Sequence, residues 1–122
     1  LHMGCGNSEL SEQLYDFLGL RCCCNVDFSE EVIKQMRQRN ATARPELDWV
    51  VGDCTDLSTF DEKSFDLVLE KGLIDAIACA PQPKRSQKFK ALVSEVARLL
   101  VDDGAYVLAT VDPDRARELQ EA

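Results

Sequence analysis

A glycine-containing turn near the start of the chain limits the fold more than any other feature. Gly4-Cys5-Gly6 follows a short run that contains Leu1 and Met3, and a stretch with helical spacing comes next. Its apolar residues are Leu10, Leu14, Phe17 and Leu18. This order predicts a strand, a tight turn and a helix, with Asn7 or Ser8 as the helix N-cap. Glycine suits such a turn because it tolerates unusual backbone angles and lets a ligand approach closely.

An aspartate ends the second apolar run. Residues 22–26 form this run, and Asp27 follows directly. Ser29, with Glu30 and Glu31 behind it, predicts the N-cap and acidic first turn of a second helix. Asp27 is therefore expected at the carboxyl end of the second strand, where a carboxylate can accept hydrogen bonds from both hydroxyls of a ribose. The sequence thus favours a cofactor that carries a nucleoside.

Further strands and a long helix follow. The sequence predicts a third strand at residues 49–54, which ends in an acidic residue. It predicts a fourth strand at residues 65–70 and a fifth at residues 105–111. A helix before the fifth strand has an apolar stripe and is expected to close at Asp102-Asp103-Gly104. The stripe consists of Phe89, Leu92, Val93, Val96, Leu99 and Leu100. The basic cluster of Lys84, Arg85, Lys88 and Lys90 is expected to be the solvated start of this helix.

Alternating strands and helices predict the α/β class. The expected architecture is a three-layer, Rossmann-like, open and mostly parallel sheet with helices on both faces. A ligand in such a fold lies across the carboxyl ends of the strands. The residues expected to converge there are Gly6, Asp27, Asp53 and Glu70.

The turn departs from the dinucleotide pattern G-x-G-x-x-G, because Glu9 stands at the third glycine position. A pyrophosphate would meet an extra negative charge there, so a cofactor without phosphate, such as S-adenosylmethionine, becomes the better candidate. Residues 52–56 superficially resemble a segment of short-chain NAD-linked oxidoreductases, but the Tyr-x-x-x-Lys pair of those enzymes is missing.

Five segments, in order, resemble class I (seven-β-strand) S-adenosylmethionine-dependent methyltransferases. They are LHMGCGNS, NVDFS, VVGDCTDL, FDLVLEKGLIDA and LLVDDGAYVLAT. GCGNS, DFS and LEKGLIDA are most similar to the eukaryotic branch of lysine methyltransferases of elongation factor 1-alpha and their citrate-synthase-modifying relative. The resemblance implies methyl transfer from S-adenosyl-L-methionine, with S-adenosyl-L-homocysteine as product. A protein lysine amine is the favoured acceptor, and a small-molecule amine or hydroxyl is the alternative.

The resemblance also implies cofactor-binding roles for matching positions. Gly4, Cys5 and Gly6 would pass beneath the methionine moiety, with Asn7 next to them. Asp27 would bind the ribose hydroxyls, and Phe28 would lie against the adenine. Asp53 would accept from the adenine amino group, and the Cys54 amide would meet a ring nitrogen. Two departures occur at the methionine end, where His2 replaces a common acid and Ser8 replaces a glycine.

Glu70 and Asp75 are the candidate catalytic residues. By the same resemblance, Glu70 would face the amino acid end of the cofactor and the incoming substrate, and either carboxylate would orient the acceptor amine. The Asn-Pro-Pro-aromatic segment of amide and adenine N-methyltransferases is missing, since Glu70-Lys71-Gly72-Leu73 stands at that point. The substrate is therefore expected to be of another class.

Structural interpretations exist for the same residues. Asp27 and Asp53 can be strand-end or capping aspartates, and Phe28 can be a core residue. Glu70, Lys71 and Asp75 can form a solvated, salt-bridged turn. A noncatalytic methyltransferase-like binding module is the corresponding alternative function.

Composition limits the partners. With 14 basic and 22 acidic residues, the net charge is −8, which disfavours nucleic acid and suits a cationic protein. No apolar run approaches the roughly 18 residues of a membrane helix. The six cysteines match neither a zinc site nor a disulfide framework, so no metal is expected. Reduced cysteines lead us to expect an intracellular, cytoplasmic protein. Residues 1–122 are expected to form one methyltransferase core, without the N-terminal segment and last strands of the family.

Overall fold

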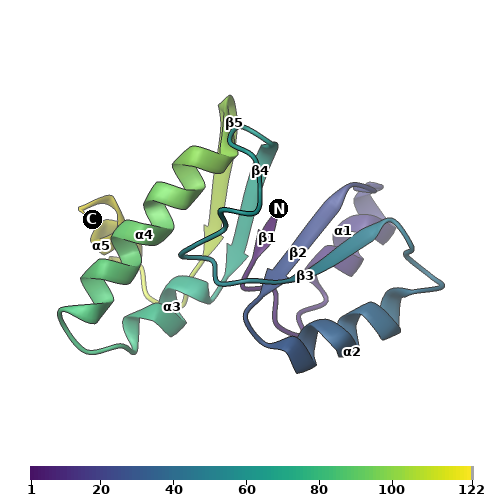
Figure 1. The fold of residues 1–122 in the computed structure, drawn as a ribbon, viewed down its shortest axis with the longest axis horizontal. Coiled ribbons are helices and arrows are strands. Elements are labelled where there is room, and N and C mark those ends of the chain that lie inside the picture. Colours follow the sequence, from purple (N-terminus) through teal and green to yellow (C-terminus); the bar gives the residue numbers. More distant parts are fainter. Residues whose placement is uncertain (122) are drawn as a thin grey trace.

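The computed structural model describes residues 1–121 and contains a five-stranded sheet (Figure 1). Its strands are β1 (His2–Met3), β2 (Cys23–Asp27), β3 (Leu47–Val51), β4 (Phe65–Lys71) and β5 (Leu100–Ala109). The strand order is β3-β2-β1-β4-β5, and all four pairings are parallel. Every strand therefore delivers its carboxyl end to the same edge of the sheet, as the sequence predicted.

Two groups of helices cover opposite faces of this sheet (Figure 1). α1 (Leu10–Leu18) and α2 (Glu30–Asn40) lie on one face, and α3 (Leu73–Ala78), α4 (Lys84–Leu99) and α5 (Asp114–Gln120) lie on the other. Successive strand residues alternate between the faces, as the two-residue period of a strand requires. The predicted three-layer α/β fold is confirmed.

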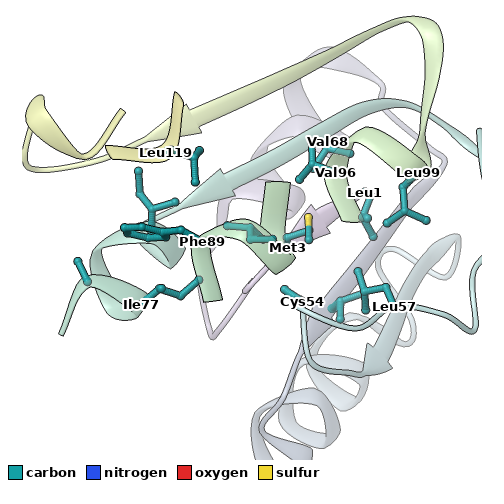
Figure 2. Close-up of a cluster of buried hydrophobic side chains, with 14 residues drawn as sticks. Leu1, Met3, Cys54, Leu57, Val68, Ile77, Phe89, Val96, Leu99 and Leu119 are labelled. Atoms are coloured by element: carbon teal, nitrogen blue, oxygen red, sulfur yellow. The ribbon is translucent and has the colours of Figure 1, made fainter. Parts of the chain in front are cut away.

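The larger core fills the space between the sheet and α3, α4 and α5 (Figure 2). Met3, Val26 and Val68 contribute from the sheet, and Phe89 and Leu92 contribute from α4; all are at most 2% exposed. The predicted stripe of α4 is thus confirmed from Phe89 to Leu99, where apolar residues at helical spacing pack on the sheet, whereas Leu100 belongs to β5. On the opposite face, a smaller core contains Cys5, Tyr15, Cys23, Ile33, Met36, Leu47 and Trp49.

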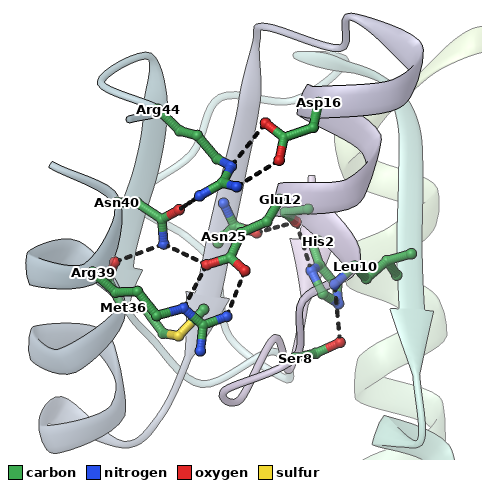
Figure 3. Close-up of polar contacts among 11 residues, drawn as sticks. His2, Ser8, Leu10, Glu12, Asp16, Asn25, Met36, Arg39, Asn40 and Arg44 are labelled. Atoms are coloured by element: carbon green, nitrogen blue, oxygen red, sulfur yellow. Dashed lines mark hydrogen bonds and ion pairs between the residues drawn. The ribbon is translucent and has the colours of Figure 1, made fainter. Parts of the chain in front are cut away.

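A buried polar network lies beside the smaller core (Figure 3). His2 Nδ1 is 2.9 Å from Ser11 Oγ, which donates to Asn25 Oδ1 at 2.5 Å. All three side chains are at most 1% exposed, so the Ser–His pair holds α1 on the sheet and has no access to a substrate. His2 therefore has a structural role.

Ion pairs join α1 to α2 and its following turn. Glu12 accepts from Arg39 Nε at 2.6 Å and from Asn40 Nδ2 at 2.9 Å, and Asp16 pairs with Arg44 at 2.5 Å (Figure 3). The guanidinium of Arg39 is the main cause of a lowered pKa of Glu12. These contacts fix the helix that follows the glycine turn.

Some predicted helix and strand boundaries are wrong. The N-cap of α1 is Glu9, which makes no side-chain cap, and Ser8 Oγ accepts from the Leu10 amide at 3.2 Å. Ser29 caps α2 as predicted, because its hydroxyl accepts from the Val32 amide at 3.3 Å. β3 ends at Val51, so Asp53 lies in a turn just beyond the strand.

The segment 102–104 does not close α4. That helix ends at Leu99, and β5 begins at Leu100 and includes Asp102-Asp103-Gly104. The register between β4 and β5 shifts between Phe65, which pairs with Leu100, and Leu67, which pairs with Ala105. The extra residues of β5 have no partner on β4 and lie within this irregularity. Residues that favour turns fit such an irregular stretch better than a regular strand.

Candidate functional site

A cavity of about 410 Å³ lies at the carboxyl edge of the sheet. Five of the predicted site residues line it: Gly4, Asp27, Phe28, Asp53 and Cys54. They come from the ends of three neighbouring strands and the turns that follow. The predicted meeting of these segments at one edge is therefore found, although five other candidates, Cys5, Gly6, Asn7, Glu70 and Asp75, lie outside the lining.

The glycine turn packs closely against both α3 and β2 at this edge. Gly4 and Gly6 have positive φ angles of +61° and +51°, a region that L-residues other than glycine rarely adopt. A Cβ on Gly4 would lie 3.0 Å from Leu73 Cδ1, so the turn packs against the start of α3. The Cys5 amide donates to the Val26 carbonyl at 2.9 Å, which attaches the turn to β2.

Cys5 and Asn7 lie on opposite sides of the chain at this turn. Cys5 is 1% exposed and points into the smaller core, where burial raises the pKa of its thiol to about 12. Asn7 is exposed to solvent. Any contact of these two residues with a ligand in the cavity would therefore come from backbone atoms or from a rearranged side chain.

Asp27 is held in place by two backbone amides. Oδ2 accepts from the Gly6 amide and Oδ1 accepts from the Ser29 amide, both at 2.9 Å. The residue is 8% exposed and lines the cavity. A carboxylate has about four acceptor positions, so two remain for hydroxyl donors. Asp27 is thus a strand-end residue, while Ser29 caps α2, and the free acceptor positions of Asp27 leave the ligand-binding interpretation intact.

Asp53 lies at the next strand end and is exposed to solvent. Its Oδ1 accepts from both the amide and the hydroxyl of Thr55, at 2.9 and 2.7 Å. These hydrogen bonds lower the pKa of the Asp53 carboxyl, with a smaller contribution from the positive charge of Lys88. The side chain is therefore an ionised acceptor at neutral pH.

The two residues beside these aspartates differ in burial. Phe28 is 81% exposed and lines the cavity, so its interpretation as a core residue is wrong. Cys54 is 6% exposed, and burial raises the pKa of its thiol to about 12. A neutral thiol is a poor nucleophile, in agreement with the expectation that this position acts through its backbone.

Glu70 is buried beneath the cavity and does not form part of its wall. It is 2% exposed, and its Oε2 accepts from the Leu73 amide at 2.7 Å, which places the carboxyl at the start of α3. Among the described residues Oε1 has no hydrogen-bond partner. Burial raises the pKa of this carboxyl. The interpretation of Glu70 as part of a solvated turn is therefore wrong.

Asp75 joins α3 to the segment after β5. Its Oδ1 accepts from the Thr110 hydroxyl at 2.7 Å, and its Oδ2 accepts from the Val111 amide at 3.2 Å. Both oxygens thus contact the protein, away from the residues that line the cavity. Asp75 is close enough to Glu70 for its charge to help raise the pKa of that carboxyl, but Asp75 does not line the cavity.

The remaining lining residues were not predicted to belong to the site. An apolar wall comes from Leu73, Ala76 and Ile77 of α3, and two cations face the cavity, Lys71 and Lys88. The basic cluster lies in the first turns of α4 as predicted, with Lys84 and Lys90 exposed, whereas Lys88 is half-buried and faces the cavity. A signal for Lys88 was available, since it precedes the buried Phe89 by one residue and Leu92 by four, on the flank of the apolar stripe.

The described residues contain no helix long and apolar enough to cross a membrane. Within residues 1–121 there is also no group of three or more His, Cys, Asp or Glu side chains arranged to hold a metal ion.

A family model described as "Methyltransferase domain" matches residues 1–108. The chain belongs to this methyltransferase domain family. It is 46% identical over 107 residues to the human protein "eEF1A lysine and N-terminal methyltransferase", a match that covers 88% of the chain and 15% of that protein. It is 39% identical over 116 residues to mouse "EEF1A lysine methyltransferase 4", covering 90% of the chain and 44% of that protein.

These relatives confirm the resemblance to the elongation factor 1-alpha lysine methyltransferase branch. The fold is also similar to that of the PH0226 protein from Pyrococcus horikoshii OT3, with a TM-score of 0.72 and 27% identity, covering 88% of the chain and 46% of that protein. The chain thus spans a small part of the human relative and less than half of the mouse one.

Proposed function

We propose that this domain binds S-adenosyl-L-methionine and takes part in methyl transfer to a protein lysine amine. The single observation that carries the proposal is the position of Asp27. Its carboxylate is fixed between two backbone amides at the carboxyl end of β2 and still lines the cavity. A fixed acceptor at this point of a parallel sheet suits the two hydroxyls of a ribose.

The other groups of the cavity fit the rest of such a cofactor. Exposed Phe28 offers an aromatic face on which a planar base can pack, and ionised Asp53 offers an acceptor for an exocyclic amino group. The two carboxylates would repel a pyrophosphate, so a nucleoside joined to an amino acid is the better match. When bound, S-adenosyl-L-methionine supplies a sulfonium methyl group that is already activated toward nucleophiles.

The chain itself has to hold and orient the two reactants, a task of proximity. A lysine amine has an ordinary pKa of about 10.4 and attacks only as the neutral base. The apolar wall of Leu73, Ala76 and Ile77 disfavours the charged ammonium near the cavity, which promotes loss of the proton. With the cofactor held along Asp27, Phe28 and Asp53, this wall would place the neutral amine beside the methyl group that the cofactor would supply.

Glu70 and Asp75 have a positioning role in this proposal. Glu70 binds the first amide of α3 and Asp75 anchors the same helix to the end of β5. Together they hold the apolar wall against the glycine turn. The acceptor proposal also takes support from charge, because a net charge of −8 attracts a cationic protein region. A cytoplasmic location stays a prediction.

Calorimetric titration with S-adenosylhomocysteine tests the cofactor site. Asp27→Asn removes the charge with little change in size, and Asp48→Asn is its matched control on the exposed face of β3. We expect saturable binding that weakens about tenfold or more in Asp27→Asn, since hydrogen bonds to a charged group contribute about 1.5–3 kcal/mol. Asp48→Asn should match the parent. A folded parent chain that does not bind would contradict the proposal.

Transfer of labelled methyl groups tests the reaction. The full-length protein that contains this domain is incubated with labelled S-adenosylmethionine and elongation factor 1-alpha. Label on a lysine supports the proposal, and label on a small molecule alone would assign the alternative acceptor. Cofactor binding with no transfer to any acceptor would identify a noncatalytic module instead.

A further inference from the structure

Lys71 is the cation at the β4 end of the cavity. It is the last residue of β4, it pairs with Ala109 of β5, and its neighbour Glu70 pairs with Met3 of β1. Lys71 therefore lies level with Gly4, beside the glycine turn. It is exposed and lines the cavity, and the ion pairs among residues 1–121 do not include it.

Charge is distributed unevenly along the cavity. Across the edge of the sheet, the order is Asp53 after β3, Asp27 on β2, Gly4 after β1 and Lys71 on β4. Neighbouring strands are about 4.8 Å apart, so the β3 and β4 ends are separated by about 14 Å. Both carboxylates occupy one half of this distance, and Lys71 occupies the other end.

The second cation of the cavity belongs to the acidic half. Lys88 is close enough to Asp53 for its charge to contribute to the lowered pKa of that carboxyl. Lys71 takes part in no ion pair within residues 1–121. The two backbone amides that follow it are occupied, since Gly72 donates to the Ala109 carbonyl and Leu73 donates to Glu70. The ammonium of Lys71 is thus a charged donor available to an anionic group at this end.

These charges select one orientation for a nucleoside joined to an amino acid. With the ribose at Asp27, the base can extend toward Phe28 and Asp53 or in the opposite direction. The base carries donors that suit Asp53, whereas the amino acid carries a carboxylate that Asp53 would repel. The favourable orientation directs the carboxylate toward β4.

We propose that Lys71 binds the carboxylate at the amino acid end of the cofactor and thereby sets its orientation in the cavity. This inference rests on the proposed function. It predicts that the site distinguishes S-adenosylhomocysteine from adenosyl thioethers that lack the carboxylate. The contact is between an exposed ammonium and a carboxylate, so it should also weaken with increasing salt concentration.

Binding of two ligands to three proteins tests the proposal. The ligands are S-adenosylhomocysteine and its decarboxylated form, which differ only in the carboxylate. The proteins are the parent, Lys71→Met and the control Lys84→Met, at an exposed α4 position outside the cavity. We expect Lys71→Met to weaken S-adenosylhomocysteine binding about tenfold and to leave binding of the decarboxylated ligand within twofold. Lys84→Met should change neither.

Lys71→Arg and Lys71→Gln keep the test decisive if the methionine variant does not fold. Arginine should preserve the preference for the carboxylate, and glutamine should reduce it. If folded Lys71 variants lost affinity equally for both ligands, or lost affinity for neither, the role of Lys71 would be overturned. A folded parent that binds neither ligand would instead contradict the proposed function, so the two failures are distinguishable.

Discussion

The amide of Gly6 donates to Oδ2 of Asp27 at 2.9 Å and thereby joins the turn after β1 to the end of β2. The two residues are 21 positions apart in the sequence. The contact orders the glycine turn and the carboxylate together, so the turn conformation and the proposed ribose site depend on each other.

Substitutions at the two glycines of the turn should differ in cost. Gly4→Ala and Gly6→Ala both place an L-residue at positive φ, which costs about 1–2 kcal/mol. Gly6 has open space around the added methyl group, whereas Gly4 would bring it to 3.0 Å from Leu73. We expect a loss of about 1 kcal/mol for Gly6→Ala and about 2–3 kcal/mol for Gly4→Ala in urea unfolding. Equal losses would contradict the close packing of Gly4 on α3.

Stability should rise with pH between about 4 and 6.5 because of His2. Burial lowers the pKa of this imidazole from 6.5 to about 4, so in that range the unfolded chain binds a proton that the folded chain does not. The free energy of unfolding therefore increases with pH through this window, by up to about 3 kcal/mol. The sole histidine of the sequence gives one imidazole NMR signal whose titration checks the pKa directly.

A variant isolates this contribution from those of the carboxylates. His2→Gln removes the ionisable group, so its unfolding free energy should lose the part of the pH dependence that lies between about 4 and 6.5. An imidazole that titrates near 6.5 in the folded protein would contradict the burial of His2.

The cysteines should separate into two reactivity classes. Cys22 and Cys79 are exposed, whereas Cys5 and Cys54 are buried with a pKa of about 12 for each thiol. With iodoacetamide at pH 8, we expect mass spectrometry to find the exposed pair alkylated at least tenfold faster, because the thiolate is the reacting form. Labelling in urea provides the control, since all thiols should then react alike. Fast alkylation of Cys54 in the folded protein would show that its environment is more open.

Glu70→Gln separates a positioning role from a catalytic one. Glutamine can still accept from the Leu73 amide, and it removes a buried ionisable group whose pKa burial raises. We expect unchanged or greater stability at pH 8, cofactor affinity within threefold of the parent, and methyl transfer at a similar rate. Glu70→Ala, which removes the hydrogen bond, should lose about 1 kcal/mol in unfolding.

Kinetics decide between the two roles of Glu70. Loss of turnover by about 100-fold in Glu70→Gln, with normal cofactor binding, would show that the charge itself acts on the reaction. A loss confined to Glu70→Ala would agree with positioning of α3.

Much of the element order could be predicted because its signals are local. Strand-end acids, the cap at Ser29 and the apolar stripe of α4 each depend on residues close together in the sequence. The boundary error at residues 102–104 has a non-local cause. Pairing of β5 with β4 extends the strand through a segment whose local composition favours a turn.

The sequence alone determined the parallel α/β order, because parallel connections place successive strand ends together. It also led to the prediction that Gly6, Asp27, Asp53 and Glu70 converge at one edge, of which Asp27 and Asp53 line the cavity. Only the tertiary structure decided which side chains reach the cavity. Glu70 and Lys71 are adjacent in the sequence, yet α3 covers the first and leaves the second exposed. Neighbouring residues of a strand point to opposite faces, and burial at each face depends on the helix packed there. That packing depends on the whole fold and cannot be predicted from the spacing of residues within one segment.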